Sequence, residues 1–106
     1  MFEKLLFWKN NPAHDRFAQE LLDQFTAMFP ERFTEGDDKK ARAKLDRTLS
    51  HMKRRVHEYS TTHELNIYSR ARIGNRFMWG LREKGYDDTF SENVTNILLH
   101  AFKFGK

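Results

Sequence analysis

Large apolar side chains recur with a helical period along most of the chain. Between residues 12 and 29 they follow one another at steps of four, four and three, which is the spacing of one helix face. They are Phe17, Leu21, Phe25 and Met28. Asn11 suits the N-cap and Pro12 the first helical position, while Pro30 cannot continue a helix. We therefore predict a helix here, with its acidic residues Asp15, Glu20 and Asp23 on the solvent side.

The clearest apolar pattern lies between residues 38 and 59, where the steps are four, four, three, four and three. Its members are Ala41, Leu45, Leu49, Met52, Val56 and Tyr59. Asp37 and Asp38 precede it and suit a helix N-terminus, because acidic side chains cap it and interact favourably with the helix dipole. We predict a helix over residues 38–59. The preceding stretch, 31–36, is predicted to be a loop whose Phe33 side chain packs into the core.

Residues 60–63 allow two interpretations. Serine and threonine are poor within a helix and good at its start, and Thr61 with Glu64 has the spacing of a capping box. We therefore favour a new helix over residues 63–84, although the apolar phase continues to Ile67 and one long bent helix is the alternative. The predicted buried positions of this helix are Ile67, Ala71, Gly74, Met78 and Leu81.

The last predicted helix begins after a turn at Gly85, a typical helix stop. Thr89 and Glu92 again match a capping box, and we expect the helix to run to about Phe104. The inward positions are predicted to be Phe90, Val94, Ile97, Leu98, Ala101 and Phe102.

These elements predict an all-α fold. Four main helices with short connections and a short N-terminal element favour a single compact bundle, residues 1–106, with no linker that would divide domains. The apolar run near the start, which includes Phe2 and Leu5 to Trp8, is too short to span a bilayer. We expect it to pack as a helix or strand, and a short amphipathic anchor on a membrane surface is the alternative.

The composition excludes several classes of protein. The chain has no cysteine, so disulfide scaffolds, thiol nucleophiles and cysteine metal sites are excluded. Its aromatic content of 14% is too high for a disordered charged tail. With no export signal and no cysteine, we expect a cytoplasmic protein.

The net charge of +4 hides an uneven distribution along the chain. Residues 39–84 hold 13 basic and 4 acidic side chains, whereas residues 1–38 hold 4 basic and 8 acidic ones. Such asymmetry indicates either an anionic partner or pairing between segments of the chain.

One helix face of the basic segment carries almost only cations. Lys40, Lys44, Arg47, His51 and Arg54 recur at four, three, four and three, and we call them the basic stripe. A helix with such a face can lie along phosphates and release their counterions. The alternative is a solvated face that pairs with the acidic first helix.

A second face mixes aromatic and polar side chains. Tyr68, Arg72, Asn75, Trp79 and Arg82 have the same spacing, and we call them the mixed stripe; Arg76 lies beside it. Guanidinium groups bind phosphate or carboxylate through planar, two-point contacts, and aromatic rings can stack on bases or pack against a bound peptide. The alternative is that this helix is central, which would make Tyr68 and Trp79 core residues.

No motif of catalysis, metal binding or cofactor binding stands out. His51, His57 and His63 are six residues apart and so do not share a helix face. There is no glycine-rich phosphate loop and no nucleophile elbow. The turn at Gly85 is similar to that of many helical hairpins, but helix 89–104 has Lys103 as its one basic residue and is a poor recognition helix.

We therefore predict a non-enzymatic binding module without cofactor, metal or small-molecule substrate. Its partner would be anionic, a nucleic acid or an acidic protein. Phosphates would be contacted by Lys40, Lys44, Arg47, Arg54, Arg72 and Arg76, with Tyr68 or Trp79 stacking. The alternative is a protein–protein adaptor or regulator that works as a homodimer, because 10 Phe, 2 Trp and 4 Met exceed what one small bundle covers easily.

Overall fold

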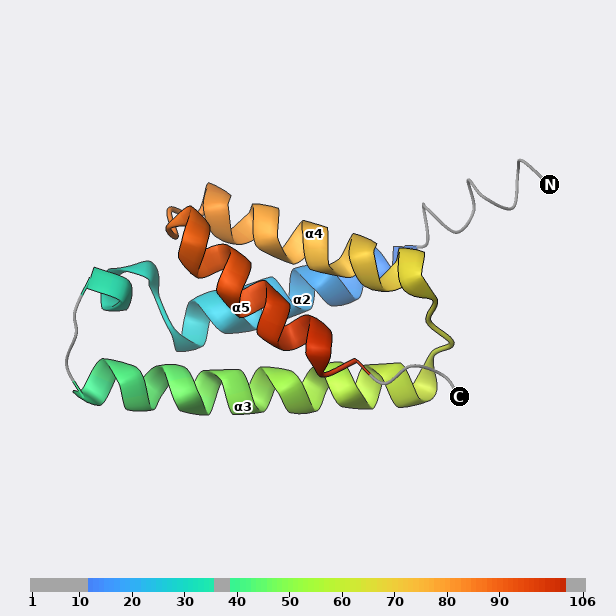
Figure 1. Ribbon diagram of the computed structural model, residues 1–106, viewed down its shortest axis with the longest axis horizontal. Helices are drawn as coiled ribbons and strands as arrows, with labels where there is room; N and C mark the ends of the chain where they lie inside the picture. The colour runs from blue at the N-terminus through green and yellow to red at the C-terminus, as the bar shows by residue number, and fades with distance from the viewer. Residues whose placement is uncertain (1–11, 36–38, 103–106) are drawn as a thin grey trace.

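The computed structural model describes residues 12–35 and 39–102. Within these ranges the elements are four α-helices and one short 3₁₀ helix, and no strand occurs (Figure 1). They are α2 (Pro12–Met28), η1 (Glu31–Glu35), α3 (Lys39–Thr62), α4 (Ile67–Glu83) and α5 (Asp88–His100). The predicted all-α bundle of four main helices is confirmed. The predicted N-terminal element, the caps at Asn11, Asp37 and Asp38, and the end of the last helix beyond residue 102 lie outside the described residues.

The helices α3 and α4 lie on opposite sides of the bundle. In Figure 1, α3 runs along the lower edge and α4 along the upper edge, with α2 and α5 between them. The most extensive packing is between α2 and α4 and between α4 and α5, while α3 packs against α2 and α5. Because the described elements pack against one side of α3 only, its other side is exposed among the described residues. No helix in the described ranges is long and apolar enough to cross a membrane.

The core is centred on Phe25 of α2, which is fully buried. Its ring centroid lies 5.9 Å from those of Phe77 and Tyr86 and 6.1 Å from that of Phe29, with steep interplanar angles. Edge-to-face pairs of this kind add about 0.5–1.5 kcal/mol each beyond the burial of apolar area. The Tyr86 hydroxyl donates to the Phe29 carbonyl at 2.6 Å, and burial raises the pKa of Tyr86 to about 12.

The predicted break between the second and third helices is confirmed, but its position differs from the prediction. The helix α3 continues to Thr62, and the cap of α4 is Asn66, whose side-chain oxygen accepts from the Ser69 amide at 2.8 Å. The capping box predicted at Thr61 and Glu64 is wrong. The Thr61 hydroxyl donates instead to the Glu58 carbonyl at 2.8 Å, a local bond that lets threonine stay inside a helix.

The start of α5 also differs from its predicted cap. Asp87 is the N-cap, and its carboxylate accepts from the amides of Thr89 and Phe90 at 3.0 and 3.2 Å. The Thr89–Glu92 capping box is therefore wrong by two residues. The predicted stop at Gly85 is confirmed, since its φ of 98° is a left-handed conformation that glycine adopts without strain.

The buried face of α4 is rotated from the predicted one but overlaps it, since Gly74 and Leu81 are buried as predicted and Met78 is half-buried. Ile67 is 66% exposed and Ala71 is also exposed, whereas Ile73 and Phe77 are buried. The rotation follows from close helix contacts at glycines: a Cβ on Gly80 would lie 2.3 Å from Leu22 Cδ2. A Cβ on Gly74 would lie 2.9 Å from Leu99 Cδ2. The sequence prediction placed Gly74 on the buried face but left out Gly80, and it counted the exposed Ile67 and Ala71 as buried.

The other predicted core positions mostly hold. In α3, Ala41, Met52 and Val56 are buried, and Leu45, Leu49 and Tyr59 pack against the core while partly exposed. Phe33 of η1 also packs against the core, as predicted. In α5, Ile97 is 38% exposed, so its predicted inward position is wrong.

Candidate nucleic-acid interface

The basic stripe lies on the solvent side of α3. Lys40, Arg47 and Arg54 are exposed, and Lys44 and His51 are half-buried. In the part of the chain that the structure describes, none of the four Lys and Arg side chains of the stripe forms an ion pair. Lys40 and Arg54 are 14 residues apart, so the stripe extends over about 21 Å of helix at 1.5 Å per residue. It is a linear row of uncompensated positive charge.

The acidic residues of α2 engage a different side of α3. Glu20 pairs with Arg55 at 3.3 Å, and Arg55 also donates to Gln24. Asp23 accepts from the Gln19 side chain at 2.9 Å on α2 itself. The two helices therefore pair at Arg55, which flanks the basic stripe, and this contact does not reach the stripe.

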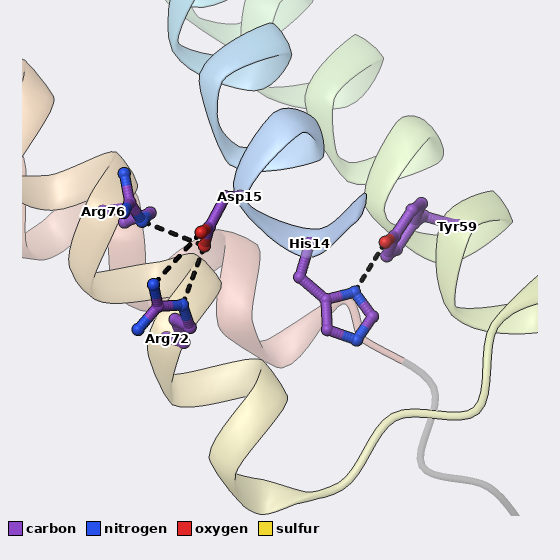
Figure 2. A network of polar contacts seen from close by, with 5 residues as sticks. All are labelled: His14, Asp15, Tyr59, Arg72 and Arg76. Atoms are coloured by element: carbon purple, nitrogen blue, oxygen red, sulfur yellow. Dashed lines mark hydrogen bonds and ion pairs between the residues drawn. The ribbon is translucent and has the colours of Figure 1, made fainter. Parts of the chain in front are cut away.

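Two cations of α4 are held by one carboxylate of α2 (Figure 2). The Nε and Nη2 atoms of Arg72 contact the two oxygens of Asp15 at 2.7 and 3.1 Å, and Arg76 Nε lies 2.9 Å from Oδ1. The hydrogen bond from Arg72 is the main reason that the pKa of Asp15 is lowered. The prediction that Asp15 lies on the solvent side is wrong, since its side chain joins α2 to α4. Arg72 and Arg76, both predicted to contact phosphate, thus have an internal partner.

The aromatic members of the mixed stripe are not core residues. Tyr68 is 64% and Trp79 is 56% exposed, so the alternative that α4 buries them is wrong. The guanidinium carbon of Arg82 lies 4.9 Å from the Trp79 ring centroid, and Arg82 Nε lies 3.3 Å from an oxygen of Asp88. Arg82 therefore also has an acidic neighbour.

The eight predicted contact residues do not form one surface. Lys40, Lys44, Arg47 and Arg54 lie on α3, while Tyr68, Arg72, Arg76 and Trp79 lie on α4. These helices occupy opposite sides of the bundle (Figure 1). In the described ranges the first surface is cationic and forms no ion pair, and the second is aromatic with arginines that contact acidic side chains.

A network that the sequence did not indicate holds α2 against α3. His14 Nδ1 lies 2.6 Å from the Tyr59 hydroxyl, and the Tyr59 ring stacks on Phe17 and on His63 at 3.9 Å each. Figure 2 shows the consecutive residues His14 and Asp15 pointing to opposite sides, toward α3 and α4. No local spacing signals this contact, because Tyr59 lies 45 residues from His14.

Burial sets the protonation of this network. Burial lowers the pKa of His14; the charge of His63 acts in the same direction, and that of Asp15 opposes it. Burial also raises the pKa of Tyr59 to about 12, and the charge of Glu20 adds to this shift. Both side chains are therefore uncharged at neutral pH. The network positions α3 on the bundle, and the basic stripe with it.

Other chemistry finds less support among the described residues. Over residues 12–35 and 39–102, no group of three or more His, Cys, Asp and Glu side chains is placed to hold a metal ion. A cleft of about 370 Å³ between α2 and α3 is bordered by Arg16, Glu20, Arg55 and Glu58, whose charges oppose one another.

The sequence and fold were also compared with known proteins. No family model, no curated protein and no solved structure gave a significant match.

Proposed function

We propose that this protein is a non-enzymatic binding module that holds nucleic acid on the solvent side of α3. The observation that carries the proposal is the basic stripe itself: Lys40, Lys44, Arg47 and Arg54 form a row without ion pairs in the described ranges. Like charges at this spacing repel one another and weaken a helix slightly. A phosphate backbone would relieve that repulsion.

The geometry of the stripe suits a linear polyanion. Duplex DNA carries one negative charge per 1.7 Å of axis, so about 12 phosphates lie alongside the 21 Å of the stripe. Each phosphate neutralised by a lysine or arginine releases counterions, and that release drives binding. Lys39, Arg42 and Lys53 are also exposed on α3, but at 100° per residue they lie a quarter turn or more away from the stripe. Recognition of this kind follows charge and helix length, with little dependence on base sequence.

A pair of matched double variants tests this proposal. Lys40→Gln with Arg54→Gln removes two charges from the stripe, and Arg16→Gln with Lys84→Gln removes two exposed charges from α2 and the end of α4. Binding of a fluorescein-labelled 20-nucleotide strand is measured by anisotropy in 20 mM salt. We expect the stripe variant to bind about ten-fold more weakly and the control variant to lose less than two-fold. Equal losses in both, or no binding by the wild type, would overturn the proposal.

The exposed face of α4 supports a second candidate function, homodimerisation. Ile67 and Tyr68 at the start of α4 and Trp79 near its end are large apolar side chains that are more than half exposed, and a second copy lying along α4 would cover them. Arg72 and Arg76 beside them share the Asp15 carboxylate, which lowers the charge of this group from +2 to +1 and weakens the repulsion between two copies of the face.

Sedimentation velocity tests this second function. A dimer of the wild type that dissociates in the Trp79→Gln variant is the expected result. A wild-type monomer at 100 µM, or a dimer that Trp79→Gln leaves intact, rejects α4 as the dimer interface.

A further inference from the structure

A hollow of about 400 Å³ opens beside the N-terminal end of the basic stripe. It is lined by one aromatic ring, two methyl groups and three cationic side chains. These are Phe33, Ala41, Ala43, Lys40, Lys44 and Arg47. The volume is within the range of small-ligand sites, which combine an apolar lining with a few polar groups.

The aromatic ring in the hollow already interacts with cations. The Lys44 ammonium lies 5.5 Å and the Arg32 guanidinium carbon 4.9 Å from the Phe33 ring centroid. The same ring contacts Phe29 of the core at 5.9 Å, which fixes its position on the bundle. Phe33 is therefore a half-buried ring that packs on the core and is bordered by charged side chains.

We propose that this hollow takes an unstacked nucleobase, which makes the α3 surface selective for single-stranded nucleic acid. The inference rests on the proposed function and specifies its partner. A base has a flat π-face that stacks on an aromatic ring, and its phosphate neighbours lie within reach of the cations around it. Paired bases inside a duplex are stacked on one another and cannot enter the hollow.

Lys44 can exchange its contact when a base enters. Its ammonium lies over the Phe33 ring, an interaction weaker than the stacking of a base, and its stem is flexible. The ammonium can leave Phe33 and contact a phosphate of the same strand. Lys40 and Arg47 lie one turn away on either side of Lys44 and would contact the adjoining phosphates.

The test compares three probes of equal length on the wild-type protein: a single strand of mixed sequence, the same sequence as a duplex, and an abasic deoxyribose-phosphate strand. The abasic strand keeps the phosphate charge and removes every base. We expect the single strand to bind about ten-fold more tightly than the abasic strand, and more tightly than the duplex.

The Phe33→Leu variant then assigns the difference to the hollow. Leucine keeps the apolar contact with the core, which thermal unfolding followed by circular dichroism checks. We expect Phe33→Leu to bind the single strand about ten-fold more weakly and the abasic strand unchanged.

Three outcomes contradict the inference and are distinguishable. If all three probes bind equally and Phe33→Leu changes nothing, the basic stripe binds phosphate but the hollow takes no base. If no probe binds in 20 mM salt, both the inference and the proposed function fail. A ten-fold preference for the single strand that persists in Phe33→Leu also overturns the inference, because stacking then occurs elsewhere.

Discussion

Single carboxylates and imidazoles, rather than surface charges in general, decide how this bundle is held together. Asp15 joins two arginines of α4, and its side chain is 25% exposed. We predict that Asp15→Asn lowers the free energy of unfolding by about 1–2 kcal/mol, because the partly buried Arg72 and the more exposed Arg76 lose a charged partner. Urea denaturation measures this, with Asp23→Asn as the control on the exposed side of α2. An equal loss in both variants would show that the pairing with α4 contributes nothing.

His14 makes stability depend on pH in the mildly acidic range. Its pKa in the folded protein lies below the ordinary value of 6.5, so the unfolded chain binds a proton first as the pH falls. Above pH 6.5 the titration of His14 should therefore leave the free energy of unfolding unchanged. Below pH 6.5 it should lower the free energy of unfolding as the pH falls. Tyr59, His63 and Asp15 are the titratable groups that interact with His14.

Urea midpoints between pH 7.5 and 5 in wild type and His14→Gln check this pH dependence. We expect the decrease to be shallower in the variant, whose side chain carries no proton to titrate. The same decrease in both proteins would assign the pH dependence to other groups.

The start of α4 shows how a helix boundary can be missed at the level of the element. Both Thr61 and Asn66 are polar residues between two apolar stripes, and sequence spacing alone favoured Thr61. The structure distinguishes them because Asn66 accepts an amide hydrogen bond at the open end of α4, whereas Thr61 bonds within α3.

We predict that Asn66→Ala lowers stability by about 1 kcal/mol, the usual contribution of an N-cap, and that Thr61→Ala lowers it by less than half as much. Thermal unfolding of the two variants under identical conditions makes the comparison. A larger loss in Thr61→Ala would mean that the helix begins where the capping box predicted.

The packing of α4 explains why its phase was harder to predict than that of α3. Met52 and Val56 of α3 are buried as predicted, since α3 has neighbours on one side and a single apolar stripe suffices. The helix α4 packs against both α2 and α5, and its closest contacts are at Gly80 and Gly74.

We predict that Gly80→Ala destabilises the protein by about 1–2 kcal/mol, although alanine is the better helix former, because its methyl group would overlap Leu22. Gly74→Ala should lower the free energy of unfolding by less, because its added methyl group would lie farther from Leu99 than that of Gly80→Ala lies from Leu22. Chemical denaturation of both variants orders them, and a stabilised Gly80→Ala would show that the contact between α2 and α4 is loose.

At the scale of the whole molecule, the sequence predicted the fold class and the location of positive charge but not which charges are neutralised. Helical periodicity and turn residues are local signals, so four helices could be read from them. The contact of Asp15 with Arg72 joins residues 57 apart, and no local pattern contains it. The same limit hid the His14–Tyr59 contact. The fold thus divides one basic segment into an open cationic surface on α3 and an aromatic surface on α4 whose arginines contact acidic side chains.

Salt dependence of nucleic-acid binding tests most directly whether the open surface on α3 is the functional one. For a single-stranded probe, four phosphate contacts predict that log K falls with log salt concentration with a slope of about −3. Lys40→Gln with Arg54→Gln should reduce that slope by about 1.4, while Arg16→Gln with Lys84→Gln should leave it unchanged. A slope near zero, or one that both variants reduce equally, would contradict binding through the basic stripe of α3.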